Sequence, residues 1–356
     1  MKLRCHGDRL KRASVVARMF VSSQVLPVCG YVEIEAKDGR AYLRATDMEK
    51  MVVMDLSATV EEEGKVLIPI KRLQRFAHYE KGLVVVESED RNVWLSDTDN
   101  RVKMCIANVP ADELPSVDCG EALYDVGEEF IVNLSRAWLF SAEGEEIRPV
   151  LASVLVESDG NGTVSFAAAD GFRLFASSMK ANLPAGVWLI PRKTCIVLAK
   201  LMRKKETVKM GFNGPKICFD GVPDVRIVSK LIEGKFPAYQ SLIPSQPPEW
   251  TFTVSGPVLQ SRAMQFENNI ARLTKTKDGF LRMGIGDNEE DSFWSKIPAK
   301  MTGDGKIALN PVYLADLSGM FAELTMEVTH ASSPVKVYGD LEGVTVVVMP
   351  MFVQWE

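Results

Sequence analysis

The stretch Phe166-Ala-Ala-Ala-Asp-Gly-Phe-Arg-Leu-Phe-Ala-Ser177 decides the fold class, because related stretches recur along the chain. Its first residues predict a strand, Asp170-Gly171 predicts a tight turn that glycine makes sterically cheap, and the residues after the turn predict the returning strand of a β-hairpin. Apolar strands also run into a turning Asp at Asp47 and at Asp287. The sequence therefore predicts one hairpin unit that occurs in three copies.

A second feature recurs in step with these turns. A strand runs directly into a helix that has a proline at or near its start, at Pro69, Pro191 and Pro311, where the missing N–H costs nothing. Both features recur roughly every 120 residues. The chain is therefore predicted to be α+β, with three copies of a unit in which two helices pack on antiparallel sheets. The upstream helices of these units are expected at residues 9–21, 133–142 and 257–266.

Domain boundaries are expected where turn-forming residues gather, in the segments 114–120 and 244–248. The predicted domains are residues 1–117, 118–244 and 245–356. Chance similarity among generic strands and turns is the alternative. The Asp turns and the proline-containing helix starts recur in the same register, which weighs against chance similarity.

The composition excludes several protein classes. The 356 residues are 46% hydrophobic, enough for sizeable cores, yet no run of about 18 apolar residues predicts a membrane span. Charged residues open the sequence, so no export signal is predicted. The six cysteines show no CxxC spacing and the three histidines lie far apart, so we expect reduced thiols, a cytoplasmic protein and no Cys/His metal site.

Positive charge is concentrated on the predicted helices. The whole chain carries a formal charge of −5, whereas the six helix windows are together positive and the remainder is strongly negative. A solvated helix face is the ordinary explanation for such charge, but three basic helices favour a polyanionic partner. None of the helices carries an array that would read bases, so contact with a nucleic acid would be through its phosphates and independent of sequence. The side chains predicted to face such a partner are Lys11, Arg18, Lys71, Arg75, Lys193, Lys200 and Lys204.

Motifs for catalysis are absent from the sequence. No GxxxxGK[ST], GxGxxG, HExxH or GxSxG occurs, and no catalytic residue or cofactor is predicted. A hydrolase or transferase that uses Asp170 and Arg173 is the alternative. Asp170 is better explained as a turn former whose carboxylate accepts hydrogen bonds from nearby backbone N–H groups. Met349-Pro350-Met351 is compatible either with a core or with an adaptable peptide groove.

Four motifs resemble those of one family, the bacterial replicative sliding clamp, which is the β subunit of DNA polymerase III. The first motif, residues 169–174, is similar to the family's T-D-G-H-R-L, and the resemblance extends over the whole chain. It implies a homodimeric six-domain ring of clamp domains around duplex DNA, without catalytic activity of its own. The other motifs are residues 189–194, 229–239 and 347–351.

The resemblance also implies a groove that captures short peptides of DNA polymerase, the clamp loader and repair proteins at the replisome. Phe172 stands where the family usually has His and Ser241 where Arg is common, and the chain continues past Met351, so the preferred peptide is expected to differ. For the dimer interface, the resemblance points to Met104 and Ile106 meeting Met264 and Phe266. The implied groove residues are Leu151, Ala169, Gly171, Phe172, Arg173, Leu174, Pro237, Leu242, Asn310, Tyr313, Val347, Met349, Pro350 and Met351.

Overall fold

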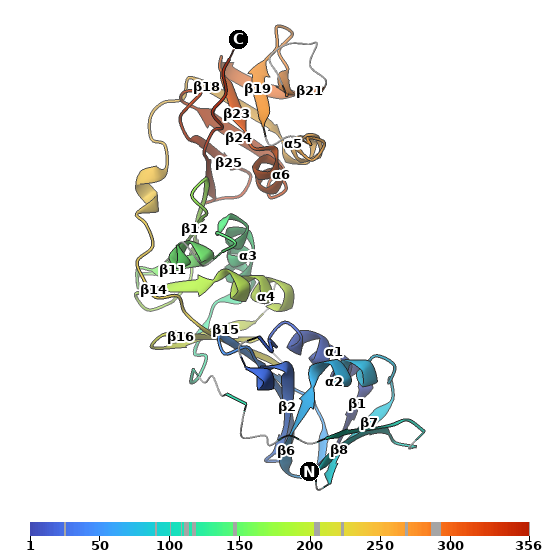
Figure 1. The fold of residues 1–356 in the computed structure, drawn as a ribbon. Helices are drawn as coiled ribbons and strands as arrows, with labels where there is room; N and C mark the ends of the chain where they lie inside the picture. The colour runs from blue at the N-terminus through green and yellow to red at the C-terminus, as the bar shows by residue number, and fades with distance from the viewer. Residues whose placement is uncertain are drawn as a thin grey trace. The chain divides into compact units, whose positions relative to one another are not determined.

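The computed structural model forms two compact units, which we describe separately (Figure 1). Unit 1 is Met1–Glu128 with Val197–Leu231, and unit 2 is Glu129–Ile196 with Ile232–Glu356. No helix among the described residues has the length and apolar character that a membrane span requires. The structure describes all residues except 25, 90, 100, 108, 110–113, 116–118, 145–147, 203–206, 222–223, 268–269, 286–292 and 356.

Unit 1 contains two antiparallel sheets and the helix pair α1 (Gly7–Ala17) and α2 (Ile70–Ala77), which lie side by side (Figure 1). The smaller sheet has the order β5 (Thr59–Glu62), β1 (Lys2–His6), β7 (Leu83–Glu89), β8 (Asn92–Asp97) and β9 (Lys103–Ala107). The larger sheet has the order β10 (Tyr124–Asp125), β15 (Val208–Asn213), β16 (Lys216–Gly221), β17 (Val225–Lys230), β4 (Lys50–Asp55), β3 (Arg40–Thr46), β2 (Tyr31–Lys37) and β6 (Gly64–Pro69).

Unit 2 repeats this plan with the helix pair α5 (Gly256–Ala263) and α6 (Pro311–Ser318). Its larger sheet has the order β14 (Gly186–Pro191), β11 (Ser153–Ser158), β12 (Thr163–Ala169), β13 (Arg173–Lys180), β26 (Thr345–Val348), β25 (Val335–Gly339), β24 (Glu323–Val328), β18 (Trp250–Ser255) and β22 (Ala299–Gly303). Its smaller sheet has the order β21 (Trp294–Ile297), β20 (Leu281–Gly284), β19 (Ala271–Lys275) and β23 (Lys306–Leu309). Helices α3 (Gly127–Ala137) and α4 (Arg192–Met202) each contain residues of both units.

The predicted hairpin is confirmed: β12 pairs with β13 around the Asp170 turn. One carboxylate oxygen of Asp170 accepts hydrogen bonds from the backbone N–H groups of Phe172 and Arg173, both at 2.9 Å. Gly171 has a φ of +95°, which a side chain would oppose. Asp47 turns the chain between β3 and β4 in the same way. The Asp287 turn lies outside the described residues.

The apolar faces of the helices pack inward, as predicted. Val16 of α1 and Leu73 and Phe76 of α2 are buried, and so is Phe20, although α1 ends at Ala17 rather than at the predicted residue 21. Helix α3 begins at Gly127, six residues before the predicted start at 133, because Phe130 continues the buried stripe toward the N-terminus.

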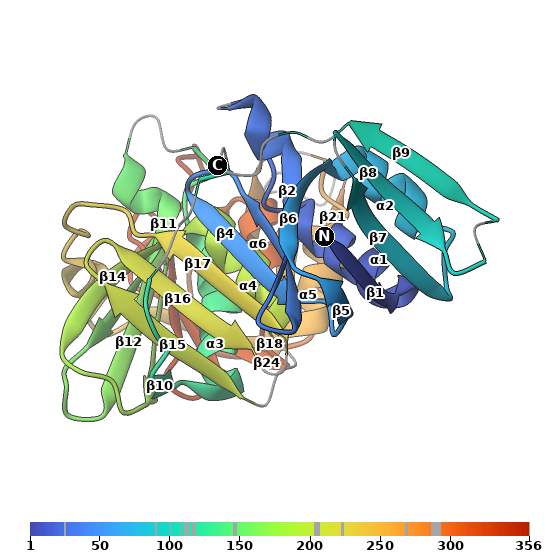
Figure 2. The same ribbon diagram turned by 90° about the horizontal axis from the view of Figure 1, so that it is seen from below.

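Strands from successive repeats join at two junctions, where the larger sheets continue from one repeat into the next. Strand β4 pairs with β17 at the first junction, and β13 pairs with β26 at the second (Figure 2 shows the first). The same backbone hydrogen bond closes both junctions: Lys230 N–H donates to the Glu49 carbonyl at 2.8 Å, and Met349 N–H donates to the Phe172 carbonyl at 2.7 Å. Each unit therefore combines a terminal repeat with part of the middle one.

Candidate functional site

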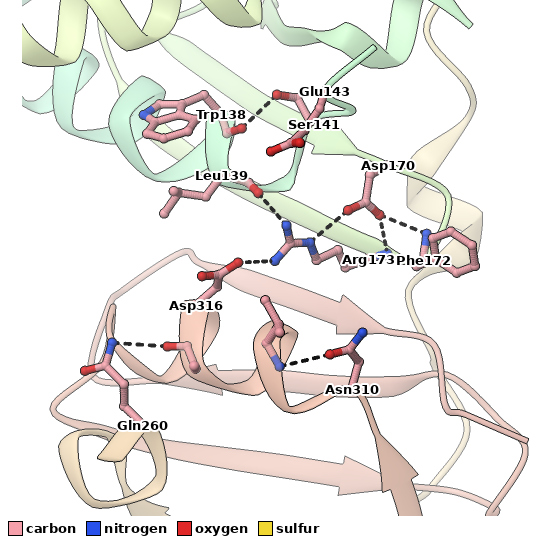
Figure 3. Close-up of polar contacts among 12 residues, drawn as sticks. Trp138, Leu139, Ser141, Glu143, Asp170, Phe172, Arg173, Gln260, Asn310 and Asp316 are labelled. Atoms are coloured by element: carbon pink, nitrogen blue, oxygen red, sulfur yellow. Dashed lines mark hydrogen bonds and ion pairs between the residues drawn. The ribbon is translucent and has the colours of Figure 1, made fainter. Parts of the chain in front are cut away.

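The second junction is organised around Arg173, the first residue of β13. Its guanidinium donates to Asp170 Oδ2 at 2.8 Å, to Asp316 Oδ2 at 2.6 Å and to the Leu139 carbonyl at 2.8 Å (Figure 3). Its side chain is 11% exposed. Arg173 therefore ties the hairpin turn to α6 and to the short helix Trp138–Phe140.

Aromatic rings enclose the same guanidinium. Its carbon lies 4.4 Å from the centre of the Tyr313 ring and 5.2 Å from that of Phe140. Burial lowers the pKa of Arg173, but its hydrogen bonds and ion pairs with Asp316 and Asp170 outweigh this effect and raise the pKa overall. Burial also raises the pKa of Tyr313. Arg173 therefore stays charged, and its guanidinium connects the hairpin turn, α6 and the short helix.

An apolar hollow of about 160 Å³ opens beside this tie. Leu174 and Val347 form its buried floor, each 4% exposed. Phe172, Leu242 and Met349 stand on its rim and are 60%, 54% and 42% exposed. A cluster of exposed large apolar side chains around a hollow is typical of an interaction site. The full lining is Ala169, Gly171, Phe172, Arg173, Leu174, Leu242, Pro334, Val347 and Met349.

A second, larger hollow of about 530 Å³ adjoins the first at the hairpin turn. Gly171 and Phe172 belong to both linings, so the Phe172 side chain lies where the two hollows meet. We call the two hollows together the junction groove. The lining of the second hollow is Ala142, Gly144, Arg148, Leu151, Asp170, Gly171 and Phe172.

Several residues implied by the resemblance line neither hollow. Asn310 caps α6 by accepting a hydrogen bond from the Val312 N–H at 2.9 Å. Met351 N–H donates to the Ala308 carbonyl at 2.7 Å, which fixes the chain after β26 against β23. Tyr313 backs the groove by contacting Arg173, and Pro237 and Pro350 are absent from both linings.

The structure adds residues that the sequence motifs do not reveal. Pro334 lies directly before β25, and Ala142, Gly144 and Arg148 lie between α3 and β11. They belong to connecting segments without a repeated pattern. One indirect signal was available, since the Asp170 turn precedes β13 and Pro334 precedes β25, and both strands pair with β26.

The first junction has the same backbone arrangement, but it has charged side chains where the second junction has apolar ones. Glu49 and Lys230 stand where the second junction has Phe172 and Met349. Lys50 corresponds to Arg173, and each of them binds the Asp of its own turn. Lys230 Nζ lies 3.5 Å from Glu49, and Lys50 forms an ion pair with Asp47. The fold therefore does not dictate the apolar groove. The groove depends instead on which side chains stand at the second junction.

The basic residues predicted to face DNA lie on the outer faces of the helices. Lys11, Lys71 and Arg75 line one hollow between α1 and α2. Arg18, Lys193 and Lys200 are exposed, and Lys204 lies outside the described residues. Over the residues that the structure describes, no cluster of His, Cys, Asp and Glu could hold a metal ion.

The residues predicted for a dimer interface lie at the two terminal repeats. Met104 is half-buried and Ile106 is buried on β9. Met264, just after α5, is 72% exposed, and the Phe266 ring packs edge-on against Phe293 with their centres 4.9 Å apart. Each site leaves apolar surface beside the edge of a sheet.

The repeated fold, with junctions formed by strands from successive repeats, is the fold of solved clamp structures. Solved structures agree: the DNA polymerase sliding clamp from Bacillus subtilis has a TM-score of 0.90 at 19% identity, with 99% of this chain and 100% of that chain covered. The sliding clamp from Pseudomonas aeruginosa bound to griselimycin has a TM-score of 0.88 at 22% identity and the same coverage. These likenesses establish the fold.

Sequence comparison finds similarity to beta sliding clamps. Residues 126–238 match the model of the DNA polymerase III beta subunit, central domain. The beta sliding clamp of Streptomyces coelicolor is 25% identical over 331 residues, which are 89% of this chain and 87% of that protein. The beta sliding clamp of Pseudomonas aeruginosa is 23% identical over 96% of this chain and 97% of its own length. The family model matches the central part of the chain, and both beta sliding clamps align with most of it.

Proposed function

We propose that the chain is a DNA sliding clamp that encircles duplex DNA and tethers DNA polymerase, the clamp loader and repair proteins, without catalysing a reaction. The junction groove carries this proposal, because it is an apolar surface that the fold does not require. Asp170 and Arg173, the residues of the alternative enzyme hypothesis, bind each other and the surrounding backbone. The protein would act in the cytoplasm, at the replication machinery.

DNA would be held loosely through its phosphates. Exposed cations on α1, α2 and α4 supply charge without any array for reading bases. Such contacts are independent of sequence and weaken as salt displaces them. A closed ring with this lining can slide, because no single contact has to be broken at high cost.

The order of strands supports closure of the ring by a second copy. Each repeat contributes two sets of strands. The first sets correspond in their strand order, which is β6-β2-β3-β4, β14-β11-β12-β13 and β23-β19-β20-β21. The second sets end in the corresponding strands β9, β17 and β26. Strand β4 pairs with β17, and β13 with β26, whereas β21 and β9 each pair on one side only among the described residues. Pairing of β21 with β9 of another copy would complete the series, and two such head-to-tail contacts would close a homodimer.

The first prediction concerns retention on DNA. Loaded by the cognate clamp loader onto nicked circular duplex DNA, the protein is expected to stay bound during gel filtration at moderate salt and to leave after the circle is cut. The ends of linear DNA release a topologically closed ring, whereas a protein bound by affinity alone does not sense them. Equal retention on circular and linear DNA of the same sequence would contradict the proposal.

The second prediction concerns the junction groove, with the peptide inhibitor griselimycin as the probe because it binds a clamp of the same fold. Phe172→Ala is expected to weaken binding roughly 5- to 30-fold, since about 1–2 kcal/mol of apolar contact is lost. Calorimetry measures the change. Phe352→Ala is the matched control, because Phe352 is 91% exposed and lines neither hollow. Equal affinities of both variants and the unmodified chain would place the binding surface elsewhere.

A further inference from the structure

The hollow between α1 and α2 combines positive charge with an exposed aromatic ring. It has a volume of about 480 Å³. The helices are fixed to each other across it: Gln74 donates to the Ser14 carbonyl and Lys11 to the His78 carbonyl, both at 3.3 Å. We call it the α1/α2 hollow. It is lined by Lys11, Ser14, Val15, Lys71, Gln74, Arg75, His78 and Tyr79.

Tyr79 is the unusual member of this lining. Its side chain is 76% exposed, although tyrosine has a large apolar ring that proteins tend to cover. The ring meets His78 edge-on, with the ring centres 4.7 Å apart. The Tyr79 backbone N–H donates to the Phe76 carbonyl at 3.4 Å, which holds the residue at the end of α2. An aromatic ring is therefore presented to solvent beside several cations.

The third repeat shows that the fold does not require this chemistry. Helix α5 starts at Gly256 as α1 starts at Gly7, and α6 follows Asn310 as α2 follows Pro69. Counted from these starts, Lys11, Lys71, Arg75, His78 and Tyr79 correspond to Gln260, Val312, Asp316, Gly319 and Met320. The same helix pair thus exists without the cations and without the aromatic ring.

We propose that the α1/α2 hollow binds unpaired DNA, with phosphates at Lys11, Lys71 and Arg75 and a base stacked on Tyr79. The bases of a duplex are stacked on each other and offer no face to a protein ring, whereas an unpaired strand does. Basic grooves with aromatic platforms are the usual means of holding single strands. Asp8 and Glu80 lie nearby in sequence, but the lining itself contains no carboxylate.

This inference rests on the proposed clamp function and adds a ligand to it. At the junction between primer and template, a clamp would meet both duplex and unpaired template. A stacking contact in the first repeat of each copy would distinguish these two parts of the ring from the others. The α1/α2 hollow would then bias the position of the clamp at such a junction.

The test compares single-stranded and duplex DNA. Binding of the full chain to a fluorescently labelled oligo(dT) strand and to a labelled duplex of equal length is measured by anisotropy at fixed salt. Tyr79→Ala is expected to weaken binding to the single strand about 5- to 50-fold and to change duplex binding less than twofold. Tyr79→Phe keeps the ring and is expected to bind like the unmodified chain. Phe352→Ala removes an exposed aromatic from a different surface and serves as the control.

Two results would overturn the inference. Tyr79→Ala could weaken binding to single-stranded and duplex DNA by the same factor, or it could leave single-strand binding unchanged. The double variant Lys71→Glu/Arg75→Glu is expected to weaken both forms, because it removes phosphate contacts. The clamp function is judged separately, by retention of Tyr79→Ala on circular duplex DNA. If Tyr79→Ala is retained on circular duplex DNA and binds single strands with unchanged affinity, the stacking site is refuted and the clamp function is not.

Discussion

Replacing Cys105 by Glu is expected to give a folded monomer that is no longer retained on circular DNA. Cys105 is exposed in the single chain. Its counterparts at the two junctions within the chain are Val228 and Val347, which are 1% and 4% exposed because a neighbouring strand covers them. If β9 pairs with β21 of a second copy, position 105 becomes equally covered. A carboxylate there would be buried without a partner.

The expected effect on dimerisation is large because an unpaired buried charge costs several kcal/mol. The dissociation constant of the dimer should rise by about 10²- to 10³-fold, as measured by analytical ultracentrifugation. Leu83→Glu is the matched control: Leu83 lies on β7 of the same sheet and is 44% exposed, away from the free edge. A Cys105→Glu variant that stays dimeric would exclude the proposed strand pairing.

The unmodified thiol supplies an independent readout. Burial raises the pKa of Cys5 and of Cys218 to about 12, and it also raises the pKa of Cys195, so these thiols are largely protonated and unreactive near pH 8. Cys105 is exposed and should react with a thiol reagent first. Its reaction is expected to slow as protein concentration increases, because dimerisation covers it.

Local signals in the sequence predicted much of the fold. The Asp170 hairpin is confirmed because turn chemistry acts within four residues, and so the sequence alone specifies it. The apolar faces around Phe20, Leu73 and Leu198 are also confirmed, since helical periodicity shows which side is buried. The start of α3 was predicted too late because Glu128 and Glu129 hide the stripe that Phe130 continues. The division into three domains remains a prediction.

Features that depend on distant parts of the chain could not be predicted in this way. Periodicity identifies β4 and β17 as strands, but it does not reveal that they pair with each other. The contribution of Pro334 to the junction groove follows from the pairing of β26 with both β13 and β25, which no local pattern encodes. The exposure of Tyr79 likewise depends on how α1 and α2 pack. The candidate groove residues taken from family motifs include eight of the nine residues that line the first hollow, but only Leu151, Gly171 and Phe172 of the second.

Replacing Arg173 by Ala is expected to destabilise the protein by about 3 kcal/mol and to abolish high-affinity binding in the junction groove. The variant leaves Asp170 and Asp316 without their partner and removes the donor to the Leu139 carbonyl. Asp170 is 15% exposed, so its unpaired charge is costly, whereas Asp316 is 37% exposed and water compensates part of its loss. The midpoint of urea unfolding, followed by tryptophan fluorescence, measures the change.

The matched control is Arg101→Ala, which removes an ion pair with Asp99 whose side chains are 80% and 61% exposed. Such a pair contributes less than about 1 kcal/mol, so its midpoint should hardly move. Arg173→Lys should recover part of the stability but not the groove, because one ammonium cannot reach Asp170, Asp316 and the Leu139 carbonyl with the planar geometry of a guanidinium. If Arg173→Ala unfolds at the same urea concentration as Arg101→Ala and still binds griselimycin, the guanidinium does not organise the groove. The walls would then be fixed by the pairing of β13 with β26 alone.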